Sequence, residues 1–194
     1  MVAIVSLLDP EHTDKLNDLI SQLEREFGLK GVQMTPYPHL TWLTANDGSL
    51  TDLQASLGRT AGVCCRFSIR STGLGIFPGE KPVLYLPVVR TPSVNSFHSQ
   101  LYESVKKISQ EIGPMYHPDF WMPHLSLALG DTTPEAVSQA VLYLNQFPLN
   151  WDMYLDNLSL LTKHDDKFLP DGVFPLLEDD PDGITVKVRT AARQ

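Results

Sequence analysis

The feature that most constrains this chain is an internal repeat. The phrase Pro38-His39-Leu40-Thr41 returns as Pro123-His124-Leu125-Ser126, at an offset of 85 residues. The same offset aligns residues upstream of the phrase: Leu16 with Leu101, Ile20 with Val105, Leu23 with Ile108, Glu26 with Glu111, Phe27 with Ile112 and Gly28 with Gly113. Two such units in one chain are expected to pack about a pseudo-twofold axis, with the two histidines facing a shared cleft.

The residues that the two copies share point to chemistry. A purely structural repeat should retain its apolar positions, but it has no need to retain an imidazole, so His39 and His124 are candidate catalytic residues. Each is followed two positions later by a hydroxyl, Thr41 or Ser126, which strand alternation places on the same face. Two facing imidazoles suit acid–base chemistry on a phosphodiester, because one proton must leave the nucleophile while another reaches the leaving oxygen.

Composition limits the partners of the chain. With 194 residues, 42% hydrophobic and 20% charged, it is typical of one globular domain or of two lobes that share a core. A net charge of −8 disfavours an extended nucleic-acid track, since Lys and Arg supply most of that affinity, but it allows a small nucleotide or one RNA end. No apolar run approaches the ~20 residues of a membrane span. We therefore expect a monomer without membrane association.

The first residues of the chain and its two cysteines indicate in which compartment of the cell the protein is expected. Residues 1–8 are apolar but lack a basic leading region and a small-residue cleavage site, which indicates a strand and not an export signal. Cys64 and Cys65 are adjacent in a stretch expected to be extended, where their side chains would point to opposite faces, so a disulfide between them is not expected. Two reduced cysteines are typical of a cytoplasmic protein.

Periodicity and turn residues predict the elements of the fold. Helices are expected over residues 10–27, 50–57, 93–112 and 134–147, with glycines 28 and 113 ending the first and third. Strands are expected over residues 2–8, 39–43, 64–77, 83–89, 124–129 and 151–162. From His164 to about residue 183, acidic residues with Pro and Gly predict an irregular solvated segment, followed by a strand at 184–188. We expect a single bilobed domain over 1–194, divided near residues 89–92.

Three aromatic residues near motif ends or turns, Tyr37, Phe77 and Trp121, are candidates for stacking on a nucleobase, although most aromatic side chains belong to a core. Lys81 lies in a predicted hairpin turn, where a solvated lysine is the default and a phosphate contact is the alternative.

The remaining histidines are weaker candidates. Surface or helix-face positions are expected for His12, His98 and His164. His117, seven residues before His124, is expected in a surface loop, with a place at the rim of the cleft as the alternative. A zinc site of His39, His124 and His117, or metal ligation by Asp179-Asp180, lacks a recognisable ligand spacing. The sequence therefore predicts no metal site.

The two motifs, read as His39-Leu40-Thr41-Trp42 and His124-Leu125-Ser126-Leu127, resemble those of the two-histidine phosphoesterase superfamily. That superfamily includes the bacterial 2′-5′ RNA ligase-like proteins and the cyclic nucleotide phosphodiesterases. The resemblance covers most of the chain up to about Thr162. It implies a bilobed α+β fold, in which two pseudo-twofold-related antiparallel sheets line a central cleft and the helices lie outside.

The resemblance also implies a function. It implies hydrolysis or transfer at a 2′,3′-cyclic or 2′-5′ phosphodiester of a nucleotide or RNA end, without metal or cofactor. One imidazole of the pair His39 and His124 would act as base and the other as acid, while Thr41 and Ser126 would hold the phosphate oxygens. The alternatives are 2′-5′ RNA ligation, which is the reverse chemistry, and a sensor that binds a nucleotide without catalysis.

Overall fold

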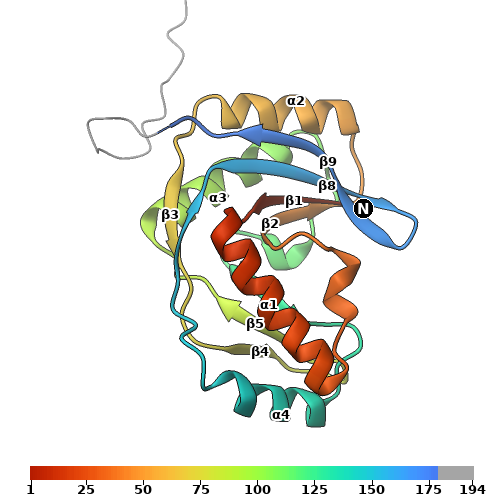
Figure 1. The fold of residues 1–194 in the computed structure, drawn as a ribbon. Coiled ribbons are helices and arrows are strands. Elements are labelled where there is room, and N and C mark those ends of the chain that lie inside the picture. The colour runs from red at the N-terminus through yellow and green to blue at the C-terminus, as the bar shows by residue number, and fades with distance from the viewer. Residues whose placement is uncertain (179–194) are drawn as a thin grey trace, which may run out of the picture.

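The computed structural model describes residues 1–178. It confirms an α+β fold with antiparallel sheets, whose helices flank the strands (Figure 1). The helices are α1 (Pro10–Phe27), α2 (Leu50–Ala61), α3 (Pro92–Val105) and α4 (Pro134–Leu144), with short 3-10 turns η1 (Gly31–Met34) and η2 (Pro114–Tyr116). None of the helices in this part of the chain is long and apolar enough to cross a membrane.

The strands form three antiparallel sheets. The first has the order β2-β1-β8-β9, the second β4-β5-β6, and the third pairs β3 with β7. The strand bounds are β1 (Val2–Leu7), β2 (His39–Ala45), β3 (Phe67–Arg70), β4 (Gly75–Phe77), β5 (Val83–Pro87), β6 (His124–Ala128), β7 (Asp152–Leu155), β8 (Asn157–His164) and β9 (Lys167–Pro175). The two motifs begin β2 and β6, which lie in different sheets.

Helix α1 shows how local sequence signals set the ends of an element. Asp9 caps its start by accepting a hydrogen bond from the backbone N–H of His12 at 3.0 Å, and Pro10 follows where no amide hydrogen is needed. Gly28 ends the helix with φ of 71°, a left-handed conformation that glycine adopts without a Cβ penalty. The predicted bounds 10–27 are therefore confirmed.

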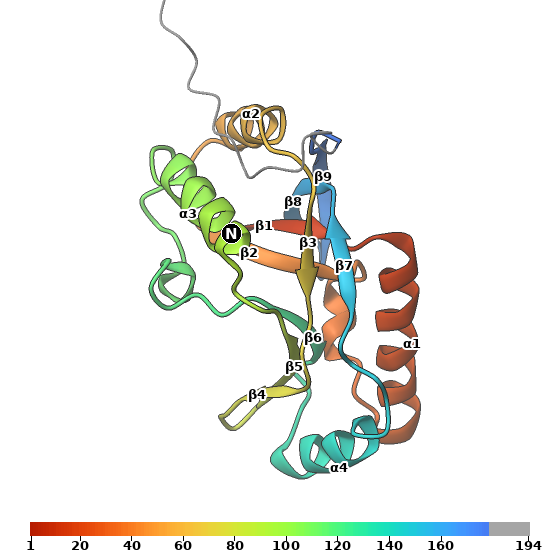
Figure 2. The ribbon, with the colours of Figure 1, turned by 90° about the vertical axis from the view of Figure 1, so that its left-hand side faces the viewer.

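The equivalent helices of the two units pack crosswise. Helix α1, from the first unit, contacts β6 and α4, whereas α3, from the second unit, contacts β2 and α2. Figure 2 shows α1 and α3 on opposite sides of the molecule with strands between them. Each motif strand is thus covered by the helix of the other unit. A single buried core runs through both units, so the predicted division into lobes near residues 89–92 stays a prediction.

Two aspartates reinforce this crosswise arrangement. Asp47, just after β2, accepts hydrogen bonds from the hydroxyl of Ser109 and from the backbone N–H groups of residues 110 and 111, beyond α3. Asp131, just after β6, accepts from the N–H groups of Lys30 and Gly31, beyond α1. A Cβ on Gly31 would lie 2.1 Å from the carbonyl oxygen of Leu129, so the close approach requires glycine.

These contacts explain one incorrect prediction. Helical periodicity predicted a helix to residue 112, but α3 ends at Val105. The chain beyond it is held by Asp47, and Ile112 forms an antiparallel bridge with Ala45 beside β2. Tertiary hydrogen bonds outweigh the local helical pattern here, so Gly113 follows a turn, a bend and the bridge at Ile112 and does not end a helix.

Other predicted elements need correction. The single strands predicted over 64–77 and 151–162 are each split: β3 and β7 pair with each other, while β4 and β8 join different sheets. The irregular acidic segment predicted from His164 contains β9, which pairs along β8. The helices predicted over 50–57 and 134–147 extend to Ala61 and end at Leu144, respectively. The strand predicted at 184–188 lies outside the described residues.

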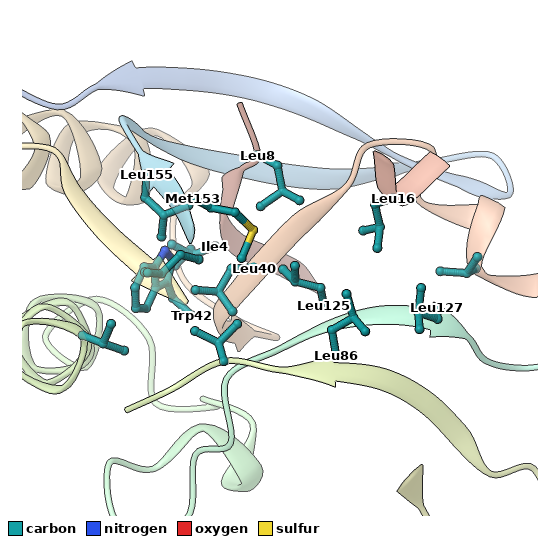
Figure 3. Packing of buried hydrophobic residues seen from close by; sticks show 14 of the residues in the cluster. Ile4, Leu8, Leu16, Leu40, Trp42, Leu86, Leu125, Leu127, Met153 and Leu155 are labelled. Carbon is teal, nitrogen blue, oxygen red and sulfur yellow. The ribbon is translucent and has the colours of Figure 1, made fainter. Parts of the chain in front are cut away.

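The core holds residues from both halves of the molecule in one packed group, and Figure 3 shows Ile4 and Leu40 of the first sheet near Leu86 and Leu125 of the second. All four side chains are fully buried. Leu40 and Leu125 are the central residues of the two motifs, so the repeat anchors both motif strands to one core.

Each motif strand carries a β-bulge at the equivalent position. In β2 the pairing with β1 passes from Thr41 to Leu43, which leaves Trp42 as the extra residue. In β6 the pairing with β5 passes from Ser126 to Ala128, which leaves Leu127 as the extra residue. A bulge bends its strand and re-aims the neighbouring side chains. The two units therefore share a β-bulge at the same position of the motif strand, in addition to the motif residues themselves.

Two buried side chains satisfy the backbone of the first bulge. The indole N–H of Trp121 donates to the carbonyl of Thr41 at 3.1 Å, and Nε2 of His98 donates to the carbonyl of Trp42 at 3.1 Å. The rings of His98 and Trp121 stack at 3.8 Å with an interplanar angle of 4°. His98 is fully buried, and so is most of His12, which corrects the surface positions predicted for both.

The burial of His98 predicts a pH dependence of stability. Burial lowers the pKa of His98 to about 4, from an ordinary value of 6.5. Between pH 6.5 and pH 4 the imidazole of His98 is protonated in the unfolded chain but stays neutral in the folded protein. The free energy of unfolding is therefore at its full value above pH 6.5 and falls as the pH falls towards 4. We expect wild type to lose about 3 kcal/mol more unfolding free energy between about pH 7 and pH 4 than His98→Gln loses.

Chemical denaturation of the two proteins across this range measures the difference. Gln at position 98 can still donate to the Trp42 carbonyl but does not titrate. The matched comparison is His164→Gln, which removes an imidazole at the exposed end of β8 and leaves His98 in place. Parallel curves for wild type and His98→Gln would contradict a buried neutral imidazole.

Candidate active site

The structure brings the four residues of the repeated motifs to one cavity. His39 and Thr41 from β2, and His124 and Ser126 from β6, line a cavity of about 480 Å³. All four are half-buried, whereas Leu40 and Leu125 between them are fully buried. Strand alternation explains this division, because the apolar residue turns to the core and its neighbours turn to the opposite face.

Both imidazoles are oriented by the same kind of hydrogen bond. Nδ1 of His39 lies 2.6 Å from the carbonyl oxygen of Tyr37, and Nδ1 of His124 lies 2.7 Å from that of Met122. The two carbonyls are again 85 positions apart. A carbonyl only accepts, so Nδ1 carries the hydrogen in each ring. Nε2 is then the nitrogen that can take up and release a proton in the cavity.

The electrostatics of the site oppose a charge on both imidazoles at once. Burial lowers the pKa of both His39 and His124 below 6.5. The hydrogen bonds from Nδ1 to the backbone carbonyls raise both pKa values, but by less than burial lowers them. A charge on His124 further lowers the pKa of His39. Two protonated imidazoles in this cavity are therefore disfavoured. One neutral and one protonated ring is the state that can both accept and donate a proton.

Aromatic packing fixes the ring of His124. Phe77 meets it edge-on at 5.0 Å, and Tyr85 lies at 5.0 Å with an interplanar angle of 56°. Phe77 and Tyr85 also stack on each other at 4.2 Å. Tyr85 is buried, while Phe77 lines the cavity, where a stacking residue would have to lie. Phe77 therefore both supports the imidazole and forms part of the wall.

The other two aromatic candidates differ from the prediction in their surroundings. Tyr37 is 40% exposed and lines a small neighbouring cavity of about 40 Å³, together with His39 and Ser126. Trp121 forms part of the main wall but is only 1% exposed, with one face against His98. The indole supports the bulge of β2 and has no open face for a nucleobase, which corrects its predicted role.

Sequence reasoning missed His98 as a support of this site. It has no partner in the repeat, and its role depends on Trp121, which is distant in the chain but stacked on it in space. The one local signal is that His98 falls on the buried stripe of its helix, beside Phe97 and Leu101.

The remaining titratable candidates lie apart from the cavity. His117 is on the loop before β6, with Nδ1 3.5 Å from a carboxylate oxygen of Asp119, and does not line the wall. Residues 1–178 contain no group of three or more His, Cys, Asp or Glu side chains that could hold a metal ion. Asp179-Asp180 lies outside the described residues. Cys64 and Cys65 are both free thiols.

Comparison with solved structures shows that this arrangement of elements is shared. TT0787 of Thermus thermophilus superposes with a TM-score of 0.64 at 19% identity, covering 92% of this chain and 99% of that one. E. coli LigT complexed with 3′-AMP gives a TM-score of 0.55 at 14% identity, covering 91% and 98%. E. coli LigT complexed with NADP⁺ gives 0.56 at 16% identity, covering 91% and 97%. These likenesses show a common fold.

Sequence comparison supplies the family. No curated protein is significantly similar to the chain. Residues 7–167 match the 2′-5′ RNA ligase superfamily, and this span includes both motifs and the whole of β2 and β6, which carry them. Its members are phosphoesterases and ligases with two histidines, as the motifs suggested. The chain therefore belongs to the 2′-5′ RNA ligase superfamily.

Proposed function

We propose that this protein is a metal-independent phosphoesterase that hydrolyses a 2′,3′-cyclic phosphodiester on a nucleotide or RNA end. The observation that carries the proposal is the paired geometry of His39 and His124. Each ring is held at Nδ1 by a backbone carbonyl, each is followed by a hydroxyl two positions on, and all four side chains line one cavity. Membership of the superfamily supports the same chemistry.

The proposed reaction uses one proton transfer at each imidazole. The neutral ring takes a proton at Nε2 from a water molecule, whose oxygen forms a bond to phosphorus. The bond from phosphorus to one ribose oxygen breaks, and the protonated ring donates its Nε2 proton to that oxygen. The product is a 2′- or 3′-phosphomonoester and a free hydroxyl. The pair ends with its protonation states exchanged.

Thr41 and Ser126 are proposed to stabilise the charge that builds on the phosphate. Each hydroxyl lies on the same strand face as its imidazole and can donate to a non-bridging oxygen. Solved relatives support a nucleotide as the group that bears this phosphate, since E. coli LigT has been crystallised with 3′-AMP, NADP⁺ and ATP.

The superfamily also favours a second candidate, 2′-5′ RNA ligation. In that reaction the 5′-hydroxyl of a second strand takes the place of water and forms the bond to phosphorus. The bond from phosphorus to one ribose oxygen of the cyclic phosphate breaks, and the two imidazoles keep the roles that they have in hydrolysis. The deciding experiment incubates the purified protein with the 2′,3′-cyclic phosphates of an RNA end, a mononucleotide and ADP-ribose. A 2′- or 3′-phosphate product supports hydrolysis, and joining to an added 5′-hydroxyl strand supports ligation.

Loss of either imidazole should remove one of the two proton transfers. We expect His39→Ala and His124→Ala each to lower kcat by ~10²- to 10⁴-fold. Steady-state assays in excess EDTA measure this, and wild type should retain full activity there. His164→Ala, which removes an exposed histidine outside the cavity, should leave kcat unchanged. Near-normal activity in either cavity variant would contradict the two-histidine mechanism.

Removal of a hydroxyl should lower activity less than removal of an imidazole, because both proton transfers remain possible. Thr41→Val and Ser126→Ala are each expected to lower kcat/KM by ~10- to 10³-fold, the upper bound being the loss of one oxyanion donor. Ser68→Ala removes an exposed hydroxyl of β3 outside the cavity and serves as the control. If both cavity variants matched wild type, the two hydroxyls would serve the sheets alone.

The lowered imidazole pKa values predict an acidic optimum. The free enzyme is active with one ring protonated, and this form is lost at high pH because burial has lowered both pKa values below 6.5. The pH profile of kcat/KM should therefore be bell-shaped with its maximum below 6.5. A bound phosphate anion stabilises the imidazolium, so the profile of kcat should lie at higher pH. A kcat/KM maximum above about pH 7 would contradict this.

A further inference from the structure

One wall of the cavity presents large apolar side chains to solvent. Met115, Phe120 and Met122 all line the cavity, and they are 68%, 67% and 52% exposed. Met115 lies in η2, and the other two lie on the segment that leads from η2 into His124. Apolar side chains gain free energy when they leave water, so a group of them in a cavity wall indicates a surface that a ligand covers.

The side-chain alternation of β6 begins before the strand, at Phe120. Phe120, Met122, His124 and Ser126 are exposed or half-buried, whereas the residues between them are buried. Phe120, Met122 and His124 therefore follow one another on the face that lines the cavity. At strand spacing, alternate side chains stand about 7 Å apart. A sugar and a base attached to a phosphate at His124 can thus extend past Met122 to Phe120, and a cavity of about 480 Å³ has room for one such molecule.

Hydrogen bonds fix the segment that carries these side chains. The guanidinium group of Arg90 donates to the carbonyl of Pro118 at 2.8 Å and to that of Trp121 at 3.1 Å. The backbone N–H of Phe120 donates to the carbonyl of His117 at 2.9 Å, and the two rings lie 5.8 Å apart. The exposed phenyl ring is therefore presented by backbone that is held on both sides. Little backbone freedom is lost when a ligand covers the ring.

The first unit does not repeat this apolar wall. At the offset of 85 residues, Phe120 corresponds to Thr35 and Met122 to Tyr37. Thr35 lines the main cavity with a short polar side chain, whereas Tyr37 lines the small neighbouring cavity and not the main one. Among residues 1–178, Phe120 is the one exposed aromatic side chain of the main cavity. An accessible ring is thus available on the side of His124.

The flat face of a nucleobase is the group that this wall fits best. Every base can stack on an aromatic side chain, and methionine makes favourable contacts with aromatic rings. Within residues 1–178, no Asn, Gln, Asp, Glu, Lys or Arg side chain lines the cavity, and these are the side chains that read base edges by hydrogen bonds. The hydroxyls of Thr35 and Tyr116 can both donate and accept, so they favour no particular base. Ring area therefore decides which base binds more tightly.

We infer that Met115, Phe120 and Met122 form a binding site for the nucleobase of the substrate, which stacks on Phe120 while its phosphate lies between the two imidazoles. This site rests on the proposed function and specifies its substrate class. The substrate is a 2′,3′-cyclic phosphate whose ribose carries a base, with a purine preferred to a pyrimidine and with adenine and guanine used alike. A cyclic phosphate without a base is a poor substrate.

The test compares four 2′,3′-cyclic phosphates, those of adenosine, guanosine, uridine and methyl β-riboside, in which a methoxy group replaces the base. We expect kcat/KM for adenosine and guanosine to agree within about threefold, and that for uridine to be lower by about three- to tenfold. The methyl riboside should be poorer than adenosine by roughly 10- to 100-fold, the size of one base–aromatic stack. The difference should lie mainly in KM, because the stack forms before the reaction and persists through it.

Variants at the ring assign the effect to one side chain. Phe120→Ala should lower kcat/KM for the adenosine substrate about tenfold and leave that for the methyl riboside unchanged. Phe120→Leu keeps an apolar side chain without a ring and should lose most of the adenosine advantage, whereas Phe120→Trp should keep it. Tyr154→Ala removes an exposed aromatic ring of β7 outside the cavity and is the matched control.

Binding gives a readout that does not depend on turnover. Titration calorimetry with adenosine 3′-monophosphate and with the 3-monophosphate of methyl β-riboside compares ligands with and without a base. Wild type and Tyr154→Ala should bind the adenosine ligand roughly 10- to 100-fold more tightly than the riboside, and Phe120→Ala should bind the two alike. A base-dependent affinity that Phe120→Ala and Phe120→Leu both retain would overturn the site.

The outcomes separate the two proposals. Turnover of all four cyclic phosphates at equal kcat/KM would leave the phosphoesterase function intact and overturn the base site. Base-dependent binding that is lost in Phe120→Ala, without turnover of any cyclic phosphate, would overturn the enzymatic function and support the base site. Failure of the ligands both to bind and to react would overturn both.

Discussion

The site depends on the burial of one leucine in each motif strand. Leu40 and Leu125 are fully buried in the same core, and each burial stabilises the fold by about 2 kcal/mol. Because side chains alternate along a strand, this burial forces the flanking histidine and hydroxyl to the opposite face. A slip by one residue would bury an imidazole and expose the leucine. Stability and orientation of the candidate catalytic groups are therefore set by the same four-residue phrase.

Two motif strands can share one cavity only if their units are held in a fixed relation. The crosswise packing provides this, since α1 covers β6 and α3 covers β2. Asp47 and Asp131 then tie the chain after each motif strand to the segment beyond the other unit's helix. Neither unit can move away without uncovering its partner's strand. The relation between the units thus follows from exchange of helices and not from contact between two separately closed halves.

The sequence predicted what local pattern and repetition control. It located α1, β2 and β6 and the four motif side chains, because caps, alternation and the shared phrase lie within short segments. It missed the end of α3, since Asp47 holds the chain there from a distant loop. It also missed β9, whose Pro, Gly and Asp residues indicate an irregular segment but which pairs along β8. His98 and Trp121 were misjudged for the same reason, because their stacking and their hydrogen bonds to the bulge of β2 join segments that are distant in the chain.

The two units share the features that contact the reacting phosphate in the proposed function, and they differ in the rest of the cavity lining. The positions that they share are the imidazole, its Nδ1 carbonyl partner, the hydroxyl and the bulge, which together suit the handling of protons and phosphate. The cavity is also lined by exposed apolar side chains from segments whose sequence the repeat does not preserve. These are Met34 in η1, Met115 in η2 and the nearby Phe120. Symmetry at the centre suits a reaction that exchanges the roles of acid and base. Asymmetry around it lets the two sides of the phosphate meet different surfaces, as a diester with unlike substituents requires.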